Sequence, residues 1–250
     1  MTIETIVPDW PAPDNIKSAV TLRFGGVSQS PYGTLNLAGH VGDNVKDVTR
    51  NRELLKNQLQ LPESPHWMTQ THSATCLLVN DGTAEGDAMI SAEHGSVLSV
   101  MTADCLPILI CNQDGSSYGV IHAGWRGLAS GIIGNTLAKF GNRPAMAWLG
   151  PAIGPCHYEV GTDVYQHFLD TTVFQPGKDE AHWLMDLYAE ARRQLVIAGV
   201  SDIYGGGYCS YCESRFYSYR RDGATGRFAA LIWSQPVQLS RMSALASSVR

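Results

Sequence analysis

The sequence predicts one mixed α/β (α+β) domain, with mixed β-sheets flanked by helices. Its 250 residues, 44% of them hydrophobic, are ample for a buried core. Strand-like and helix-like segments alternate without the regular βαβ spacing of a doubly wound sheet. No repeat, linker or low-complexity tract divides the chain. We therefore expect residues 1–250 to form a single domain, with residues 236–250 as a loosely ordered tail.

Hydrophobic periodicity and turn residues place the individual elements. The expected strands span residues 17–24, 66–69, 75–79, 97–101, 106–111 and 118–122, with a buried strand in "AMAWLG". Asp43 or Asn44 can cap a helix from about Val45 to Leu59. Two further helices are expected over Leu128–Phe140 and Trp183–Ala198. "RFYSYRRDGATGRFAALIW" predicts a hairpin with an Asp-Gly turn.

Composition excludes several functional classes. A formal net charge of −5 argues against a nucleic-acid backbone binder. The longest apolar runs are too short to span a membrane, and the N-terminal stretch lacks the apolar region of a signal peptide. A cytoplasmic location is the resulting expectation. Six cysteines in a chain of this length are too sparse for a disulfide scaffold, so thiols or metal ligands are expected.

The stretch "ADCLPILICNQDGSSYGVIHAGWRG" carries polar residues at both ends of an apolar hairpin. With Asp114-Gly115 at the centre of the turn, Cys105 lies opposite Gly124. His122 is two residues from Gly124 and therefore lies on the same face. Diagonal neighbours on one face are about 7–8 Å apart at Cα, so a thiolate and an imidazole there can share one ion.

A third ligand must come from another segment. "HWMTQTHSATC" offers His72, with Gln70 two residues before it. His72, Cys105 and His122 would form a His₂Cys set with one open position, as in catalytic zinc sites. Ordinary explanations stay open, because a buried cysteine usually acts as a small hydrophobe and a histidine near a strand end is usually only hydrogen-bonded.

Three residues beside these ligands have competing explanations. Asp104 can cap a turn, and Trp125 can be a core residue. Arg126 comes just before the helix expected from Leu128, where the helix dipole and the guanidinium both favour an anion.

Several longer motifs resemble one known family. "TQTHS", "TADCLPIL", "HAGWRGL", "LGPAIGPCHYEVG", "FYSYRRDGATGR" and the N-terminal "RFGGVSQSPYGTLNLAGHVGD" occur in the order seen in the YfiH family. This family is also called the laccase-domain, polyphenol oxidase or peptidoglycan editing factor family. The resemblance covers about residues 7–233. It implies a single YfiH-like catalytic domain with a metal, most plausibly zinc, on His72, Cys105 and His122.

The resemblance also implies purine nucleoside chemistry. The family is credited with phosphorolysis of adenosine, inosine, guanosine and methylthioadenosine and with deamination of adenosine, so the expected partners are a purine nucleoside and phosphate. The expected assembly is a monomer or a weak homo-oligomer. Asp104 is the nearest candidate for proton transfer, although strand alternation turns it away from Cys105. Candidate phosphate ligands are Arg23, Arg126 and Arg220, and further candidate site residues are Asn36, His40, Asp43 and Gln70.

Alternative functions follow from the same residues. Copper can bind a His₂Cys set and give a polyphenol oxidase, although the eight histidines contain no His-x-His pair. Hydrolytic editing of a peptidoglycan precursor is a second alternative, and a non-enzymatic module with a structural zinc is a third. The pair Cys209-x-x-Cys212 resembles a metal or redox motif, but a zinc ribbon requires a second pair.

Overall fold

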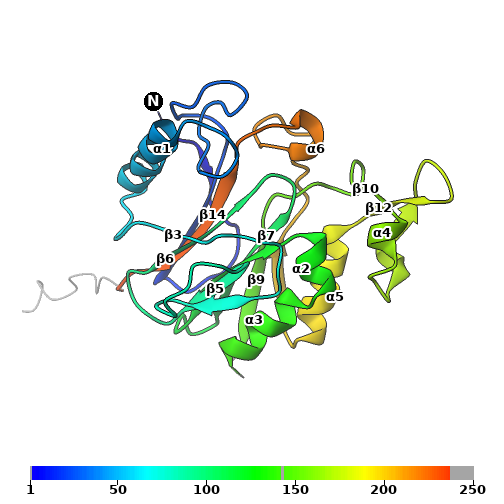
Figure 1. Ribbon diagram of the computed structural model, residues 1–250. Helices are drawn as coiled ribbons and strands as arrows, with labels where there is room; N and C mark the ends of the chain where they lie inside the picture. The colour runs from blue at the N-terminus through cyan, green and yellow to red at the C-terminus, as the bar shows by residue number, and fades with distance from the viewer. Residues whose placement is uncertain (1, 142–143, 237–250) are drawn as a thin grey trace, which may run out of the picture.

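Two large β-sheets lie face to face in the computed structural model, which describes residues 2–141 and 144–236 (Figure 1). The five-stranded sheet has the order β1 (Thr5–Ile6), β2 (Ile16–Thr21), β14 (Phe228–Ser234), β6 (Val97–Thr102), β3 (His66–Trp67). The six-stranded sheet has the order β13 (Asp202–Gly205), β9 (Ala145–Leu149), β7 (Leu106–Asn112), β8 (Tyr118–Ala123), β5 (Ala88–Ser91), β4 (Cys76–Leu78). Both sheets contain parallel and antiparallel pairs.

Apolar side chains fill the space between the two sheets. Val100 and Phe228 come from one sheet, and Leu109, Val120 and Trp148 come from the other. Every residue of β6, β7, β8 and β14 is buried. Each of these strands is covered on both faces, which explains why the sequence shows continuous apolar runs in place of strict alternation.

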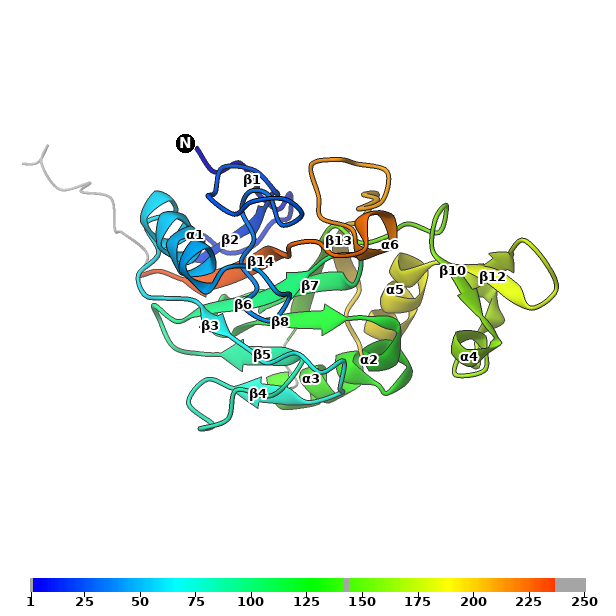
Figure 2. The same cartoon turned by 45° about the horizontal axis from the view of Figure 1, so that its top comes forward.

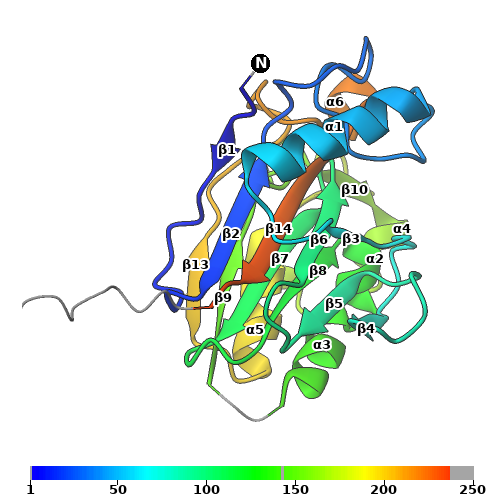
Figure 3. The same cartoon turned by 90° about the vertical axis from the view of Figure 1, so that its left-hand side faces the viewer.

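Helices cover the outer faces of the sheets. Helix α1 (Val45–Gln58) begins at the capping side chain of Asn44 and packs Leu55 against the five-stranded sheet. Three helices cover the six-stranded sheet: α2 (Trp125–Ala129), α3 (Ile132–Phe140) and α5 (Leu187–Ile197). Figure 3 shows the resulting layers, with α1 on one side, the two sheets in the middle and α3 and α5 on the other side.

A small third sheet lies beside the main layers. It consists of β10 (Glu159–Gly161), β12 (His182–Met185) and β11 (Phe174–Pro176), in that order, all antiparallel. Helix α4 (Thr162–Tyr165) and the 3₁₀ turn η1 (Thr171–Val173) connect its strands. Figure 2 shows this sheet beyond α5. Helix α6 (Tyr219–Asp222) lies close to it, because the Arg220 guanidinium donates to the Glu159 carbonyl over 2.8 Å.

The predicted mixed α+β architecture is confirmed, and so are most of its strands. Two predicted helices need correction. The helix expected over Leu128–Phe140 is two helices, because Gly131 adopts a left-handed φ of 82° between α2 and α3. Arg126 therefore lies inside α2 and not before a helix. The helix expected from Trp183 starts at Leu187, capped by Asp186, and the preceding residues form β12.

The hairpin expected around Asp222-Gly223 is wrong. This dipeptide ends helix α6, where Gly223 has a φ of 66°. The strand after it, β14, pairs with β2 and β6, which are distant in the sequence. The tail expected over residues 236–250 falls, apart from its first residue, outside the described residues. Within the described ranges, no helix is both long and apolar enough to cross a bilayer.

Candidate metal centre and active site

The β7–β8 hairpin has the register that the sequence predicts. Leu106 pairs with Ala123 and Pro107 with His122, around a connection centred on Asp114-Gly115. Cys105 lies opposite Gly124, one step beyond the last of these pairs. A Cβ atom on Gly124 would stand 2.8 Å from Cys105 Sγ and 3.1 Å from a carbon of the His72 ring. Glycine at this position therefore gives the thiol and the imidazole room to meet.

His72 reaches the hairpin from a loop that one carboxylate holds in place. The backbone N–H groups of Thr71, His72 and Ser73 all donate to the buried carboxylate of Asp87, over 2.6–3.1 Å. The Ser73 hydroxyl donates to it as well, over 2.8 Å. Asp87 directly precedes β5, so the sheet fixes this loop, in which His72 has a left-handed φ of 59°.

The same carboxylate orients His122. Nδ1 of His122 lies 2.9 Å from Oδ1 of Asp87. An ionised carboxylate only accepts hydrogen bonds, so Nδ1 carries the proton and Nε2 faces Cys105. A histidine whose second nitrogen donates to a carboxylate is the common arrangement in metal sites, where the outer carboxylate fixes the tautomer and ring orientation.

The three side chains converge as one group. Their ligand atoms all lie within 4.8 Å of one another. His72 Nε2 is 3.8 Å from Cys105 Sγ, and the two imidazole rings lie edge to face with centroids 4.9 Å apart. His122 is buried, Cys105 is half-buried and His72 is exposed, so the group opens to solvent on the His72 side. Two nitrogens and one thiol at this spacing form a candidate metal site with an accessible side.

Electrostatics at this group favour a thiolate. Burial raises the pKa of Cys105, but the adjacent imidazoles of His122 and His72 outweigh it and lower the pKa to about 6. Burial lowers the pKa of His122, but Cys105 and Asp87 outweigh it and raise the pKa to about 9. Burial likewise opposes ionisation of Asp87, yet hydrogen bonds from His122 and Ser73 lower its pKa to about 2. At neutral pH the metal-free group is therefore a thiolate and an imidazolium held beside a carboxylate.

A cavity of about 410 Å³ opens beside the three ligands. Its size fits a drug-sized ligand. Five further predicted site residues line it: His40, Gln70, Asp104, Arg126 and Arg220. The other lining residues, which the sequence does not predict as site residues, are Met101, Thr102, Ala103, Trp125, Ile153, Tyr158, Tyr219 and Arg227.

Three arginines give the cavity a cationic wall. The Arg220 guanidinium lies over the Tyr158 ring, with its central carbon 5.3 Å from the ring centroid. Arg227 lies 5.9 Å from the Tyr219 centroid. Arg126 is exposed and stacks on Trp125 at 4.3 Å. No hydrogen-bond acceptor contacts the Arg126 guanidinium within residues 2–141 and 144–236, so its donors are available to an anionic ligand.

Asp104 faces the same cavity as Cys105, although the two residues are adjacent. Its φ of 100° places it in a turn before β7, so strand alternation does not apply. Its side chain is buried and accepts hydrogen bonds from Ser210 Oγ over 2.6 Å and from the Arg220 backbone N–H over 2.7 Å. These two bonds hold the carboxylate in a fixed orientation at the cavity wall.

Three candidate residues, Asn36, Asp43 and Arg23, do not line this cavity. Asn36 is buried and bonds to Ala38, Asp43 and the backbone of Arg227. Asp43 accepts hydrogen bonds from Ser28 and Asn36. Both therefore support the loop that carries His40 and the start of β14.

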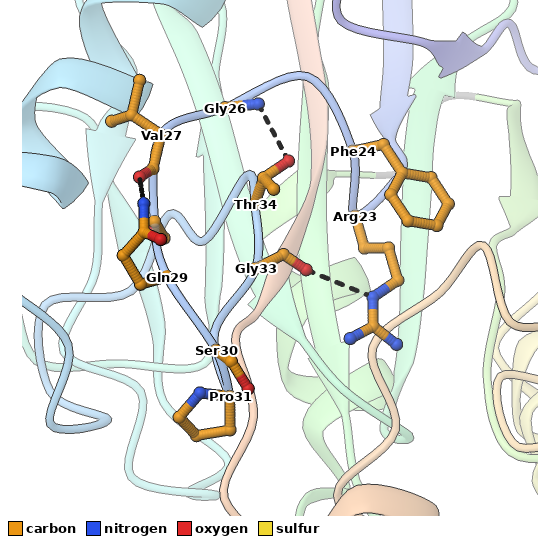
Figure 4. Close-up of a pocket in the computed structure, with 10 residues that line it drawn as sticks. Arg23, Phe24, Gly26, Val27, Gln29, Ser30, Pro31, Gly33 and Thr34 are labelled. Atoms are coloured by element: carbon orange, nitrogen blue, oxygen red, sulfur yellow. Dashed lines mark hydrogen bonds between the residues drawn. The ribbon is translucent and has the colours of Figure 1, made fainter.

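Arg23 lines a separate cavity of about 530 Å³ (Figure 4). Its guanidinium donates to the Gly33 carbonyl and pairs with Asp222 at 3.4 Å. The other residues lining this larger cavity are apolar, small or amide side chains, such as Phe24, Val27 and Gln29. It contains neither a titratable base nor a metal-ligating group, so its size does not make it the better candidate for chemistry.

Sequence reasoning missed Asp87, Gly124 and Arg227 as site residues. Asp87 reaches His122 through the pairing of β5 with β8, a contact for which the sequence carries no local signal. Gly124 could have been found, because the predicted register already placed it opposite Cys105. Arg227 directly precedes β14, and its approach to the cavity depends on the position of that strand in the sheet.

Comparisons with known proteins agree with the fold. Residues 17–235 match the family model described as "Multi-copper polyphenol oxidoreductase laccase". The chain belongs to this laccase-like family, which includes the YfiH proteins.

Relatives match the chain over nearly its whole length. A Xylella fastidiosa protein named "Purine nucleoside phosphorylase" is 45% identical, over 91% of this chain and 96% of the relative. The Escherichia coli protein named "Purine nucleoside phosphorylase YfiH" is 42% identical, over 91% and 98%. A solved Neisseria meningitidis structure is 44% identical, has a TM-score of 0.87 and aligns over 92% of this chain and 99% of its own.

Proposed function

We propose that this chain is a zinc-dependent purine nucleoside phosphorylase that also deaminates adenosine. The observation that carries the proposal is one cavity that combines a His₂Cys group with three arginines and several aromatic side chains. The names of the relatives support the phosphorylase activity. The proposed substrates are adenosine, inosine, guanosine and methylthioadenosine, with phosphate as the second substrate.

His72, Cys105 and His122 would hold the metal. Two imidazoles and a thiolate suit zinc, and three protein ligands leave one position for water or substrate. When bound, zinc would lower the pKa of a water molecule and polarise a substrate atom. Asp87 would keep the His122 ring oriented for the metal, and it fixes the backbone of the loop that carries His72.

Phosphate would bind at the cationic wall. Arginine presents a planar fork of donors that matches phosphate oxygens. The Arg126 guanidinium has no hydrogen-bond partner in the described part of the chain, whereas Arg220 and Arg227 are held by hydrogen bonds to backbone carbonyls. In phosphorolysis a phosphate oxygen forms the new bond to C1′ as the bond from C1′ to the purine nitrogen breaks. The three guanidinium groups would align the phosphate and balance its charge.

The aromatic and apolar part of the cavity would hold the purine. Trp125, Tyr158 and Tyr219 offer faces for stacking, and Met101 and Ile153 add apolar contact. Two groups are placed for proton transfer. Asp104 is fixed by Ser210 and Arg220 at the cavity wall. The pKa of His40 is lowered by burial and by the charges of Arg227 and Arg52, so its imidazole is neutral at pH 7 and can accept a proton.

The test is to incubate the protein with adenosine, with and without phosphate, and to separate the products. We expect adenine and ribose 1-phosphate when phosphate is present, and inosine in both cases. Cys105→Ala should reduce turnover at least ~100-fold, because one well-placed electrostatic contact contributes about 3–4 kcal/mol to a transition state. The matched control is Cys76→Ala, because Cys76 is buried in β4 outside the cavity. Wild-type turnover by Cys105→Ala would contradict the proposal.

A copper-dependent polyphenol oxidase is the second candidate. The description of the family and the affinity of copper(II) for imidazole and thiolate support it. This function predicts oxygen uptake with phenols after copper loading and no cleavage of adenosine. Hydrolytic editing of a cell-wall precursor is a third candidate and would use the same three ligands. It predicts that the protein hydrolyses peptidoglycan fragments when these replace adenosine in the product analysis.

A further inference from the structure

A second group of metal-ligating side chains lies outside the cavity. Cys156, His157, Cys209 and Cys212 have ligand atoms that all lie within 4.8 Å of one another. The pair Cys209-x-x-Cys212, which looks isolated in the sequence, therefore has two partners in space. We propose that these four residues bind a structural zinc ion. This proposal does not depend on the proposed enzymatic function.

The distances match those of a single tetrahedral ion. Cys156 Sγ lies 3.7 Å from both Cys209 Sγ and Cys212 Sγ. His157 Nδ1 lies 3.3 Å from Cys156 Sγ and from Cys212 Sγ. With zinc–sulfur bonds of about 2.3 Å, tetrahedral geometry places two sulfur ligands about 3.8 Å apart. A disulfide would instead bring two sulfurs to about 2.05 Å.

The fold brings the two halves of the group together. Strands β9 and β13 are parallel neighbours, with Leu149 beside Gly205, so the chain leaves both strands at the same edge of the sheet. Cys156 and His157 follow β9, and the two other cysteines follow β13. The Ser210 N–H donates to the Ala152 carbonyl over 2.9 Å and joins the two segments.

Neighbouring groups also orient the ligands. The Gly154 N–H donates to Cys209 Sγ over 3.3 Å, as expected for a sulfur that bears negative charge. The His157 ring stacks on Tyr211, with centroids 4.1 Å apart and planes at 15°. Each of these contacts restrains one of the four ligand side chains.

The donor set indicates a structural and not a catalytic ion. Four protein ligands close the coordination sphere of zinc, and Cys₃His with a Cys-x₂-Cys spacing is a common structural set. Thiolate donors in a tetrahedral arrangement select zinc or iron. The binding free energy of such an ion contributes to folding, and here it would join two loops that flank the cavity.

This ion would also support the cavity indirectly. Ser210 lies between Cys209 and Cys212, and its hydroxyl donates to Asp104 Oδ1 over 2.6 Å. The guanidinium of Arg221 donates to the Ser210 and Tyr211 carbonyls of the same loop. A closed zinc site would hold this loop, and with it the orientation of Asp104.

Metal counting on the full chain tests the proposal. Protein purified under reducing conditions with zinc should contain about two zinc ions per chain, one in each group. Cys105→Ala should keep about one zinc ion, in the Cys156, His157, Cys209 and Cys212 group. The double variant Cys209→Ser/Cys212→Ser should keep about one zinc ion in the His72, Cys105 and His122 group. Cys76→Ala, the matched control, should keep both. Loss of all zinc from Cys105→Ala would overturn the proposal, and so would iron in place of zinc.

Cobalt substitution in Cys105→Ala isolates the second group. Tetrahedral cobalt(II) with three thiolates should give strong sulfur-to-metal charge-transfer bands, and the added Cys209→Ser/Cys212→Ser change should abolish them. If that variant does not fold, His157→Ala and His157→Cys replace it. His157→Cys should retain zinc and the thermal stability, whereas His157→Ala should weaken zinc binding at least ~10-fold. Equal binding by both variants, or a disulfide between Cys156 and either partner in the reduced preparation, would overturn the proposal.

Discussion

Asp87 and His122 meet through a hydrogen bond of 2.9 Å between Oδ1 and Nδ1, and the same carboxylate accepts three backbone N–H groups from the loop of His72. One buried side chain thus positions two of the three candidate metal ligands, which lie in different segments of the chain.

Replacing Asp87 should weaken metal binding without removing a ligand. Asp87→Asn replaces the charged carboxylate by a neutral amide with a single acceptor oxygen. The amide cannot accept all of these hydrogen bonds, and the Nδ1–H of His122 loses its negatively charged partner. Loss of such an outer carboxylate typically costs 10- to 100-fold in metal affinity. Competition with a chromogenic chelator measures this change. Unchanged zinc affinity would show that Asp87 does not orient the ligands.

The stability of the metal-free protein should depend on Asp87 in acid. The folded-state pKa of Asp87 is about 2, below the unfolded value of about 3.9. Its ionisation therefore stabilises the fold above about pH 4, by about 2–3 kcal/mol, and this contribution disappears as the pH falls through about 2. Denaturant unfolding of the wild type and Asp87→Asn should show a difference in unfolding free energy that narrows from pH 7 to pH 3. A constant difference would contradict the low pKa.

Zinc uptake should release protons in a pH-dependent way. Between pH 6 and 9 the metal-free group holds a Cys105 thiolate and a His122 imidazolium. Zinc must displace the His122 proton, so about one proton should leave per ion in this range, and more should leave below pH 6, where Cys105 is also protonated. Affinity should therefore fall as the pH decreases, more steeply below pH 6. Calorimetry in buffers of different ionisation enthalpy measures the protons, with Cys209→Ser/Cys212→Ser as the background that removes the second group.

Gly124→Ala should disturb the metal site by steric contact alone. Gly124 has an ordinary φ of −72°, but its new Cβ would stand 2.8 Å from Cys105 Sγ. We expect a loss of zinc affinity of at least ~10-fold with a retained fold. Gly134→Ala is the matched control, because Gly134 lies in α3 with open space around its Cβ position. This control should retain zinc and gain about 0.5–1 kcal/mol of stability. Equal zinc affinity in both variants would refute the prediction.

Removing the Arg126 guanidinium should weaken phosphate binding. Hydrogen bonds to a charged group contribute about 1.5–3 kcal/mol, which corresponds to a rise of roughly 10- to 100-fold in the KM for phosphate. Arg23→Ala is the control, since Arg23 lines the separate cavity and pairs with Asp222. A similar KM for phosphate in both variants would remove Arg126 from the proposed binding site.

Local patterns in the sequence were enough to predict the hairpin that carries Cys105 and His122. Its turn chemistry and apolar runs set the register, and the register set the shared face. The sequence offers His72 as the third ligand from its place at the edge of another strand, and the family resemblance implies the same three residues. The sequence does not predict the hydrogen bond of Asp87 to His122, because this contact depends on the pairing of β5 with β8.

Other errors have similarly physical causes. Hydrophobic periodicity runs through Gly131 without a break, whereas the backbone there adopts a left-handed conformation. The dipeptide Asp222-Gly223 suits both a hairpin turn and the end of a helix, and only the long-range pairing of β14 decides between them. The apolar residues of β12 look helical because they continue into the pattern of α5.

The position of β14 has a consequence for the biosynthesis of the protein. This strand, residues 228–234, comes late in the chain and yet lies between β2 and β6 in the five-stranded sheet. Domains fold during synthesis only as far as the emerged chain permits. In a nascent chain that ends before residue 228, β2 and β6 each have an unpaired edge at the centre of this sheet. Such a chain also lacks β14, whose position in the sheet places the preceding residue, Arg227, at the cavity. The candidate site can therefore be completed only after residues 227–234 have left the ribosome and β14 has entered the sheet.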